Sequence, residues 1–162
     1  QLLKLKGSGH TVEEVVSAGV KNALQAVEDC GKGTVFLDIG PTGKLLRPLG
    51  ELDFEDAVSA FAEMVRAGAA AGAEAVLIET MSDIYEAKAA LLAAKENSDL
   101  PVFVTMTFDE DGKLLTEGSL AWLPPCWRAW ARMRLALIAA WSPADGRPAA
   151  KAAGADGPSH CG

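Results

Sequence analysis

Polar residues with chemical potential follow three separate apolar runs of the chain. They form three groups, which are Asp38 with Gly40-Pro41-Thr42-Gly43, Glu79 with Thr80, and Thr105 and Thr107 with Asp109. Carboxylates can hold a cation or move a proton, and hydroxyls and loop N–H groups can bind polar or anionic groups. These residues are therefore the candidate site.

Glu79 is the strongest candidate, because it comes directly after the apolar run 75–78. A carboxylate in that position should be partly buried, and burying a charge is costly unless the charge is paired. The ammonium group of a ligand would be one partner. A neighbouring Lys or Arg, or a helix-capping role, would satisfy the same carboxylate, so position alone leaves both interpretations open.

Other polar segments favour structural roles. Residues 40–43 could present N–H groups to an anion, but they also form a common turn pattern and lack the Gly-Lys-Ser/Thr of a phosphate-binding loop. Residues 109–112 resemble half of a calcium loop without its final Glu, and a hairpin turn is expected there. We expect Cys30 to be a buried small apolar residue and His10 to lie on the surface. The one His in residues 1–117 is this surface residue, so no Ser-His-Asp or Cys-His set is assigned there.

Hydrophobic periodicity predicts alternating helices and strands around these residues. The expected helices span 12–27, 54–69 and 83–97, and the expected strands span 35–39, 75–78 and 101–107. Thr11 and Glu14 have capping-box spacing, Asp53 is the expected cap of the second helix, and Ser82 that of the third, which has Asp83 and Glu86 in its first turn. The first strand is expected to be buried on both faces.

The order of these elements predicts parallel strands joined by helices. The candidate residues then gather at the carboxyl ends of the strands, where such folds place their reacting groups. With 162 residues, the chain is shorter than the about 250 of a closed eight-stranded barrel. Three strands could form part of a barrel or the core of a small open sheet.

Three motifs in this order carry a family resemblance: Val35-Phe36-Leu37-Asp38-Ile39-Gly40-Pro41-Thr42-Gly43, Ile78-Glu79-Thr80-Met81-Ser82-Asp83 and Met106-Thr107-Phe108-Asp109-Glu110. Over about residues 3–118 the chain resembles the homocysteine-binding barrel of cobalamin-dependent methionine synthase, in the homocysteine S-methyltransferase family. The resemblance implies a partial (β/α)8 TIM barrel, with three parallel strands in residues 1–118. It also implies an enzyme that transfers a methyl group to homocysteine and gives methionine.

The resemblance implies roles and partners as well. Glu79 matches the family's Glu that binds the amino group of homocysteine, and Gly40 and Thr107 are expected to bind substrate with it. Zinc, held by three Cys thiolates, would keep the homocysteine sulfur as a thiolate, and methylcobalamin would donate the methyl group. The implied partners are homocysteine and the cobalamin- and folate-binding domains of the parent enzyme.

The chain departs from the family in its zinc ligands. No Asn-Cys-Ser/Gly or Gly-Gly-x-Cys-Cys motif is present, and Cys30, Cys126 and Cys161 match none of the ligands. The sequence therefore assigns no metal ligand and no catalytic residue, and this fragment is expected to be inactive alone.

The charge and the cysteine content limit the class of protein and its expected cellular location. The net charge of −7 opposes a general nucleic-acid binder, which needs a basic face. No secretory signal pattern is visible, and three Cys without close pairing make no disulfide framework. A reducing, cytoplasmic location is therefore expected.

Composition changes sharply near residue 118. Residues 1–117 hold 20 acidic and 10 basic side chains, residues 118–162 hold 2 and 5, and all four Trp lie in the second part. Residues 127–141 could form a basic amphipathic helix, so one alternative is a non-catalytic module whose Trp-rich tail binds a membrane or a partner. A spanning helix is disfavoured, because Pro124-Pro125 interrupt it and its arginines are costly in hydrocarbon.

A shift of reading frame explains the tail better. With synonymous codons read one base early, residues 127–141 can encode Leu-Glu-Gly-Leu-Gly-Ala-Asp-Ala-Leu-Gly-Leu-Asn-Cys-Gly-Leu, which carries the zinc-ligand motif over the codons of 137–140. Read one base late, residues 143–161 can encode a further helix and strand start of the family. We therefore expect residues 119–162 to be a frame-shifted tail of low order, produced by small insertions or deletions near residues 119 and 142.

Overall fold

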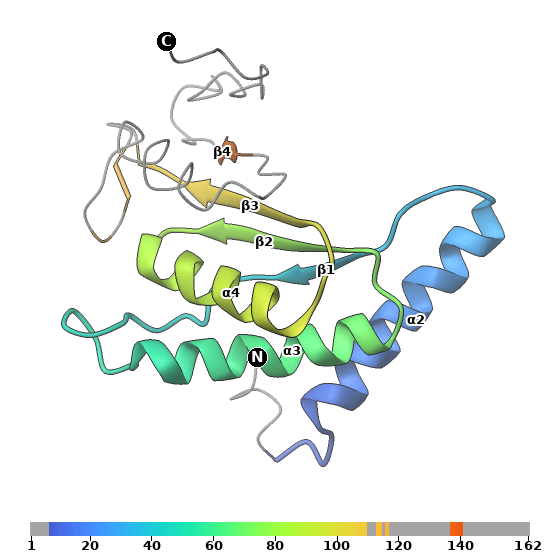
Figure 1. Ribbon diagram of the computed structural model, residues 1–162, viewed down its shortest axis with the longest axis horizontal. Coiled ribbons are helices and arrows are strands. Elements are labelled where there is room, and N and C mark those ends of the chain that lie inside the picture. The colour runs from blue at the N-terminus through green and yellow to red at the C-terminus, as the bar shows by residue number, and fades with distance from the viewer. Residues whose placement is uncertain (1–6, 110–112, 115, 117–136, 141–162) are drawn as a thin grey trace, which may run out of the picture.

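Four parallel strands and three helices make up the described part of the chain. The computed structural model describes residues 7–109, 113, 114, 116 and the backbone of 137–140. The elements are α2 (Val12–Cys30), β1 (Phe36–Ile39), α3 (Phe54–Ala70), β2 (Ala75–Met81), α4 (Ile84–Asn97), β3 (Val102–Thr107) and β4 (Leu137–Ala140). The strands follow one another in the order β1-β2-β3-β4, all parallel. The predicted alternation of helix and strand is confirmed (Figure 1).

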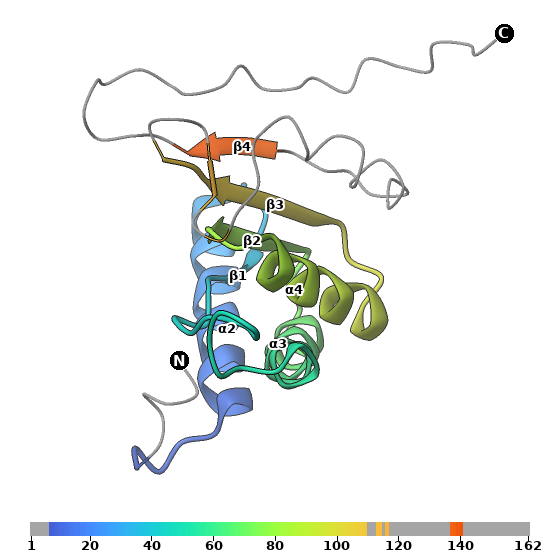
Figure 2. The same ribbon diagram turned by 90° about the vertical axis from the view of Figure 1, so that its left-hand side faces the viewer.

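The helices lie on one side of the sheet. In Figure 2, α3 and α4 run side by side against the same face, and α2 packs on α3. Successive side chains of a strand point to opposite faces, so one set from each strand meets the helices. The core on this side consists of buried strand residues (Leu37, Ile39, Val76, Ile78, Val104, Met106) against buried helix residues (Val58, Phe61, Val65, Ala90, Leu91).

The opposite face of the sheet is open among the described residues. Phe36 is 41% exposed there, and its ring lies 5.3 Å from that of Phe103, centroid to centroid. The expectation that the first strand is buried on both faces is therefore wrong. In a closed barrel this face would be the interior, filled by side chains from the remaining strands. Four strands leave it uncovered.

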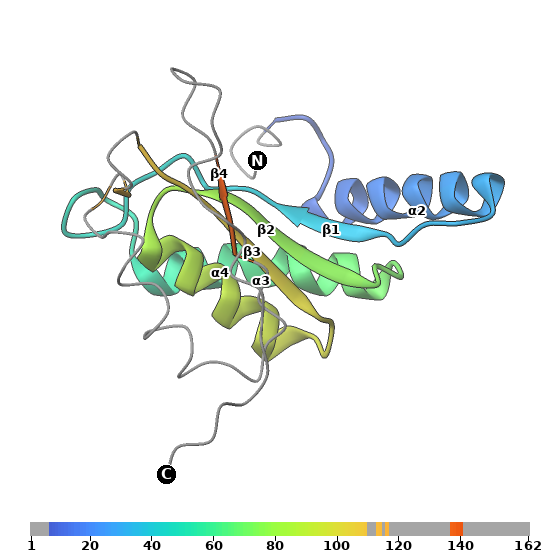
Figure 3. The ribbon, with the colours of Figure 1, turned by 90° about the horizontal axis from the view of Figure 1, so that it is seen from above.

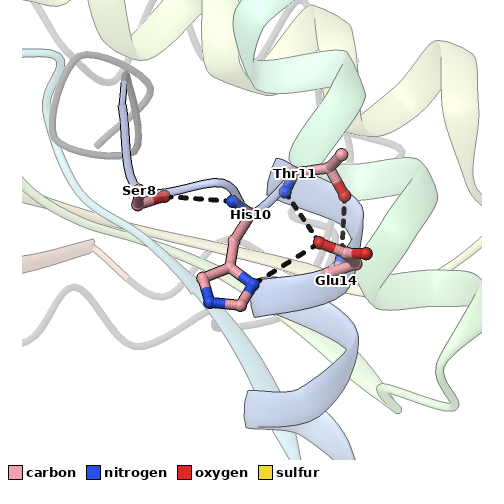
Figure 4. Close-up of polar contacts among 4 residues, drawn as sticks. All are labelled: Ser8, His10, Thr11 and Glu14. Carbon is pink, nitrogen blue, oxygen red and sulfur yellow. Dashed lines mark hydrogen bonds and ion pairs between the residues drawn. The ribbon is translucent and has the colours of Figure 1, made fainter.

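A capping box fixes the start of α2, as Thr11 and Glu14 predicted (Figure 4). The Thr11 hydroxyl accepts from the Glu14 N–H at 3.1 Å, and the Glu14 carboxylate accepts from the Thr11 N–H at 2.9 Å. This backbone hydrogen bond holds the pKa of Glu14 below its ordinary value. His10 lies on the surface, as expected, with Nδ1 3.7 Å from the same carboxylate.

Two local expectations are wrong. Asp83, and not Ser82, is the N-cap of α4, because β2 continues to Met81 and delays the first helical residue. Cys30 is exposed rather than buried. The stripe of α2 that faces the core passes through Val20, Leu24 and Val27, and a helical period of 3.6 carries it next to position 31.

The strand β4 adds to the three that were predicted and falls in the compositionally distinct tail. It pairs with β3 in parallel, with Val104 opposite Leu137 and Thr107 opposite Ala140. The rest of the Trp-rich segment, including residues 127–136, lies outside the described residues. In the part of the chain that the structure describes, no helix is both long and apolar enough to cross a membrane.

Candidate functional site

Two carboxylates from neighbouring strands meet at the carboxyl end of the sheet. Asp38 pairs in register with Leu77, so Glu79 lies one alternation further along β2 on the same open face. Desolvation, followed by the charge of Glu79 and its side-chain interaction with Asp38, raises the pKa of Asp38. Glu79 is half-buried, as its place after the apolar run predicted.

No basic side chain pairs with these carboxylates among the described residues. The ion pairs of the described chain include His10 with Glu14 at 3.7 Å and Arg47 with Asp53 at 3.3 Å, and neither pair involves Asp38 or Glu79. The alternative in which a neighbouring Lys or Arg satisfies Glu79 therefore finds no support in the described chain.

A bulge in β2 takes in Glu79 and Thr80. The register with β3 shifts between Ile78 and Met81, and Thr80 has a positive φ of 54°. The Thr80 N–H donates to the Thr105 hydroxyl at 2.9 Å, which ties the bulge to β3. Bulges of this kind re-aim side chains and recur beside active sites. Here the bulge interrupts the regular ladder after Ile78, so Glu79 lies within it.

The loop after β1 is held by an internal anion. The Glu86 side chain, on a residue only 3% exposed, accepts at Oε1 from the Thr42 N–H at 2.7 Å and from the Thr42 hydroxyl at 2.5 Å. Figure 3 shows this loop and the start of α4 at the same end of the sheet. Residues 40–43 form a loop whose N–H groups could bind an anion. In the structure the Thr42 N–H donates to the carboxylate of Glu86, a residue of the protein itself.

The other residues predicted for the site are Gly40, Thr107 and Asp109, and each lies in a different strand end or loop. Thr107 ends β3 and is half-buried, and Gly40, also half-buried, begins the loop after β1. Asp109 accepts from the Lys113 N–H at 2.7 Å and donates its own N–H to the Lys113 carbonyl at 2.9 Å. These two bonds fit the expected turn, of which residues 110–112 lie outside the described part. Sequence reasoning assigned Glu86 only to a helix start and missed its contact with Thr42.

The described residues do not fit the zinc site that the family resemblance implies. They contain no group of three His, Cys, Asp or Glu side chains that could hold a metal ion. Cys30 ends the helix that leads into β1, so it belongs to the amino end of the sheet and not to the edge with Glu79. Cys126 and Cys161 lie outside the described residues.

Comparison with known proteins agrees with this geometry. The family model of homocysteine S-methyltransferase matches residues 2–137. Among solved structures, the chain is similar to the homocysteine methyltransferase MmuM from Escherichia coli in its apo form, with a TM-score of 0.66 and 17% identity. That likeness covers 80% of this chain and 51% of the other, so this chain spans about half the length of that structural neighbour. No match was found among curated proteins.

The sheet, the similarity to the solved structure and the family match agree on the fold and the family of the chain. Four parallel strands with helices on one face are part of a (β/α)8 barrel, as the sequence predicted. The match to residues 2–137 takes in Asp38, Glu79 and Thr107 and reaches the first residue of β4. The chain belongs to the homocysteine S-methyltransferase family.

Proposed function

We propose that this chain binds the amino-acid part of homocysteine for S-methyl transfer, with Glu79 and Asp38 receiving the ammonium group. The observation that carries the proposal is the pair of carboxylates at the carboxyl end of β1 and β2, which has no cationic partner in the described chain. Family membership supplies homocysteine as the candidate ligand.

The chemistry of the pair suits an ammonium ion. Two carboxylates this close resist ionising together, so one of them retains a proton more tightly than an isolated group does. An ammonium group would replace that proton and donate hydrogen bonds to both carboxylates. Gly40 and Thr107, on either side at the ends of β1 and β3, are proposed to contact the rest of the substrate.

The methyl donor belongs to the same proposal. The family resemblance implies methylcobalamin or another methyl donor, with cobalamin- and folate-binding domains as partners. In such an enzyme zinc would keep the homocysteine sulfur as a thiolate. Because the described residues offer no ligand set for zinc, we assign no step to the metal and limit the proposal to recognition of the amino group.

Calorimetric titration of the chain with two ligands tests this role. L-Homocysteine carries the ammonium group, and 4-mercaptobutanoate lacks it but retains the thiol and the carboxylate. Hydrogen bonds to charged groups are worth about 1.5–3 kcal/mol, so the wild-type chain should prefer homocysteine by about 10–150-fold. Glu79→Gln should abolish most of that preference.

Glu96→Gln provides the matched control. Glu96 is an exposed residue in the last turn of α4, whereas Glu79 precedes the first turn of that helix. The control should bind both ligands as the wild-type chain does. Equal affinity of the wild-type chain for the two ligands, or a Glu79→Gln variant that still prefers homocysteine, would refute the proposal.

A further inference from the structure

The ladder between β1 and β2 ends where the site begins. Its last rung joins Ile39 to Ile78, one residue beyond Asp38 and one before Glu79. From there β2 bulges and bonds to β3 through Thr80 and Thr105, while β1 continues into the loop. Backbone pairing therefore does not fix the two strand ends relative to each other beyond this rung.

The contact between Thr42 and Glu86 ties the loop after β1 to the start of α4, the helix that follows β2. Thr42 comes four residues after Asp38, and Glu86 comes seven residues after Glu79. Both the backbone N–H and the hydroxyl of Thr42 donate to one oxygen of Glu86. The Thr42 hydroxyl also accepts from the Lys44 N–H at 3.2 Å, which stiffens the loop itself.

The helix end that holds Glu86 is itself fixed. The Asp83 side chain, on a residue 5% exposed, accepts from the N–H groups of Tyr85 and Glu86 at 2.7 and 3.3 Å. Two nearly buried carboxylates in one short segment are costly unless both are hydrogen-bonded, and here both are. The start of α4 is thus a rigid anchor that follows Glu79 closely in the chain.

We propose that Glu86 is a positioning residue, which acts through Thr42 to hold the end of β1 at the separation from β2 that pairs Asp38 with Glu79. The inference depends on the proposed function only for the role of the site in binding homocysteine. The two carboxylates are neighbours without any ligand, so the positioning role of Glu86 can be tested separately. Glu86 touches no substrate in this scheme. It sets the geometry of the two groups that would.

The titration of Asp38, followed by carboxyl-carbon NMR on the ligand-free chain, tests the inference. The Glu79 carboxyl next to Asp38 contributes to the raised pKa of Asp38, so separating the two groups should lower the titration midpoint. Thr42→Val removes the hydroxyl and keeps the shape, and we expect a lower midpoint for Asp38. Thr42→Ser keeps the hydroxyl and should restore the wild-type midpoint.

Glu86→Gln is the second variant, because its amide oxygen can still accept from the Thr42 N–H. It should lower the Asp38 midpoint less than Thr42→Val does, and it remains informative if Thr42→Val does not fold. A folded Thr42→Val chain with the wild-type midpoint would overturn the inference, as would a Thr42→Ser chain that matches Thr42→Val.

Ligand preference gives a second readout. The preference for homocysteine over 4-mercaptobutanoate should fall about 3–10-fold in Thr42→Val, because the loss acts on the ligand only indirectly and is taken as the net contribution of one ordinary hydrogen bond. If the wild-type chain binds neither ligand, the proposed function fails, while the Asp38 titration still decides the positioning role.

Discussion

Asp38 and Glu79 lie on adjacent parallel strands, and their carboxyl groups are neighbours at the open face of the sheet. The proximity of a second carboxylate and partial desolvation raise the pKa of Asp38 above its ordinary value. The folded chain therefore holds the Asp38 proton more tightly than the unfolded chain does. By linkage, stability falls as the pH rises from the ordinary Asp pKa to the raised folded value, and stays lower above it.

Asp38→Asn removes that titration and should stabilise the chain at neutral pH. We expect a gain of about 0.5 kcal/mol, the scale of one like-charge pair across strands, kept small because the Asp38 side chain is exposed. Urea unfolding at pH 7 and at pH 3 measures it. The gain should vanish at pH 3, where the wild-type group is protonated in both states. An equal gain at both pH values would contradict the raised pKa of Asp38.

Thr11→Ala should cost about 1 kcal/mol, the typical loss for an N-cap hydroxyl. The pKa of Glu14, the other member of the capping box, is lowered by its hydrogen bond to the Thr11 N–H. Its stabilising contribution is thus present above the unfolded pKa and is lost as the pH falls through the folded pKa. Thermal unfolding of Glu14→Gln should show a penalty at pH 7 that disappears at pH 3. Ser17→Ala, within the same helix, is the control and should not destabilise the chain.

Two helical glycines should respond to alanine in opposite directions. A Cβ at Gly68 in α3 would lie 2.6 Å from Leu37 Cδ2, so Gly68→Ala must displace either the buried Leu37 side chain or α3. We expect a loss of about 1–3 kcal/mol despite the better helix propensity. A Cβ at Gly19 in α2 would meet nothing within 4 Å, so Gly19→Ala should gain about 0.5–1 kcal/mol. Chemical denaturation measures the free energy of unfolding of both variants. A Gly68→Ala chain that is more stable than the wild type would show that α3 packs more loosely on Leu37 than described.

Local signals predicted the elements well and the long-range contacts poorly. Thr11 and Glu14 lie three residues apart, so their capping box could be identified from spacing alone. The partial burial of Glu79 could be predicted because the residue comes directly after four apolar residues. The bond between Thr42 and Glu86 joins residues 44 positions apart, and no local pattern distinguishes this Glu from any acid in a first helical turn.

The exposure of Phe36 illustrates the same limit. An apolar strand bounded by glycines has the pattern of one buried on both faces, and in a closed barrel both faces are covered. Whether the second face is covered depends on how many further strands the chain supplies. That number is set by residues far from β1, so the strand's own sequence could not predict it.

Sequencing the gene tests the proposed reading-frame shift, and β4 makes the expectation specific. This strand occupies residues 137–140, parallel to β3, and Ala139 lies opposite Met106. The codons of these residues are the ones that could encode the family's Asn-Cys-Gly motif one base earlier. We expect the genomic codons to permit that motif and to continue in frame through the following segment. A chain repaired in this way would place a thiolate on the strand next to β3, and zinc titration of the repaired chain should then show tighter binding than this chain does. Codons that exclude Asn-Cys-Gly would refute the frame shift and leave the Trp-rich tail as a true part of the product.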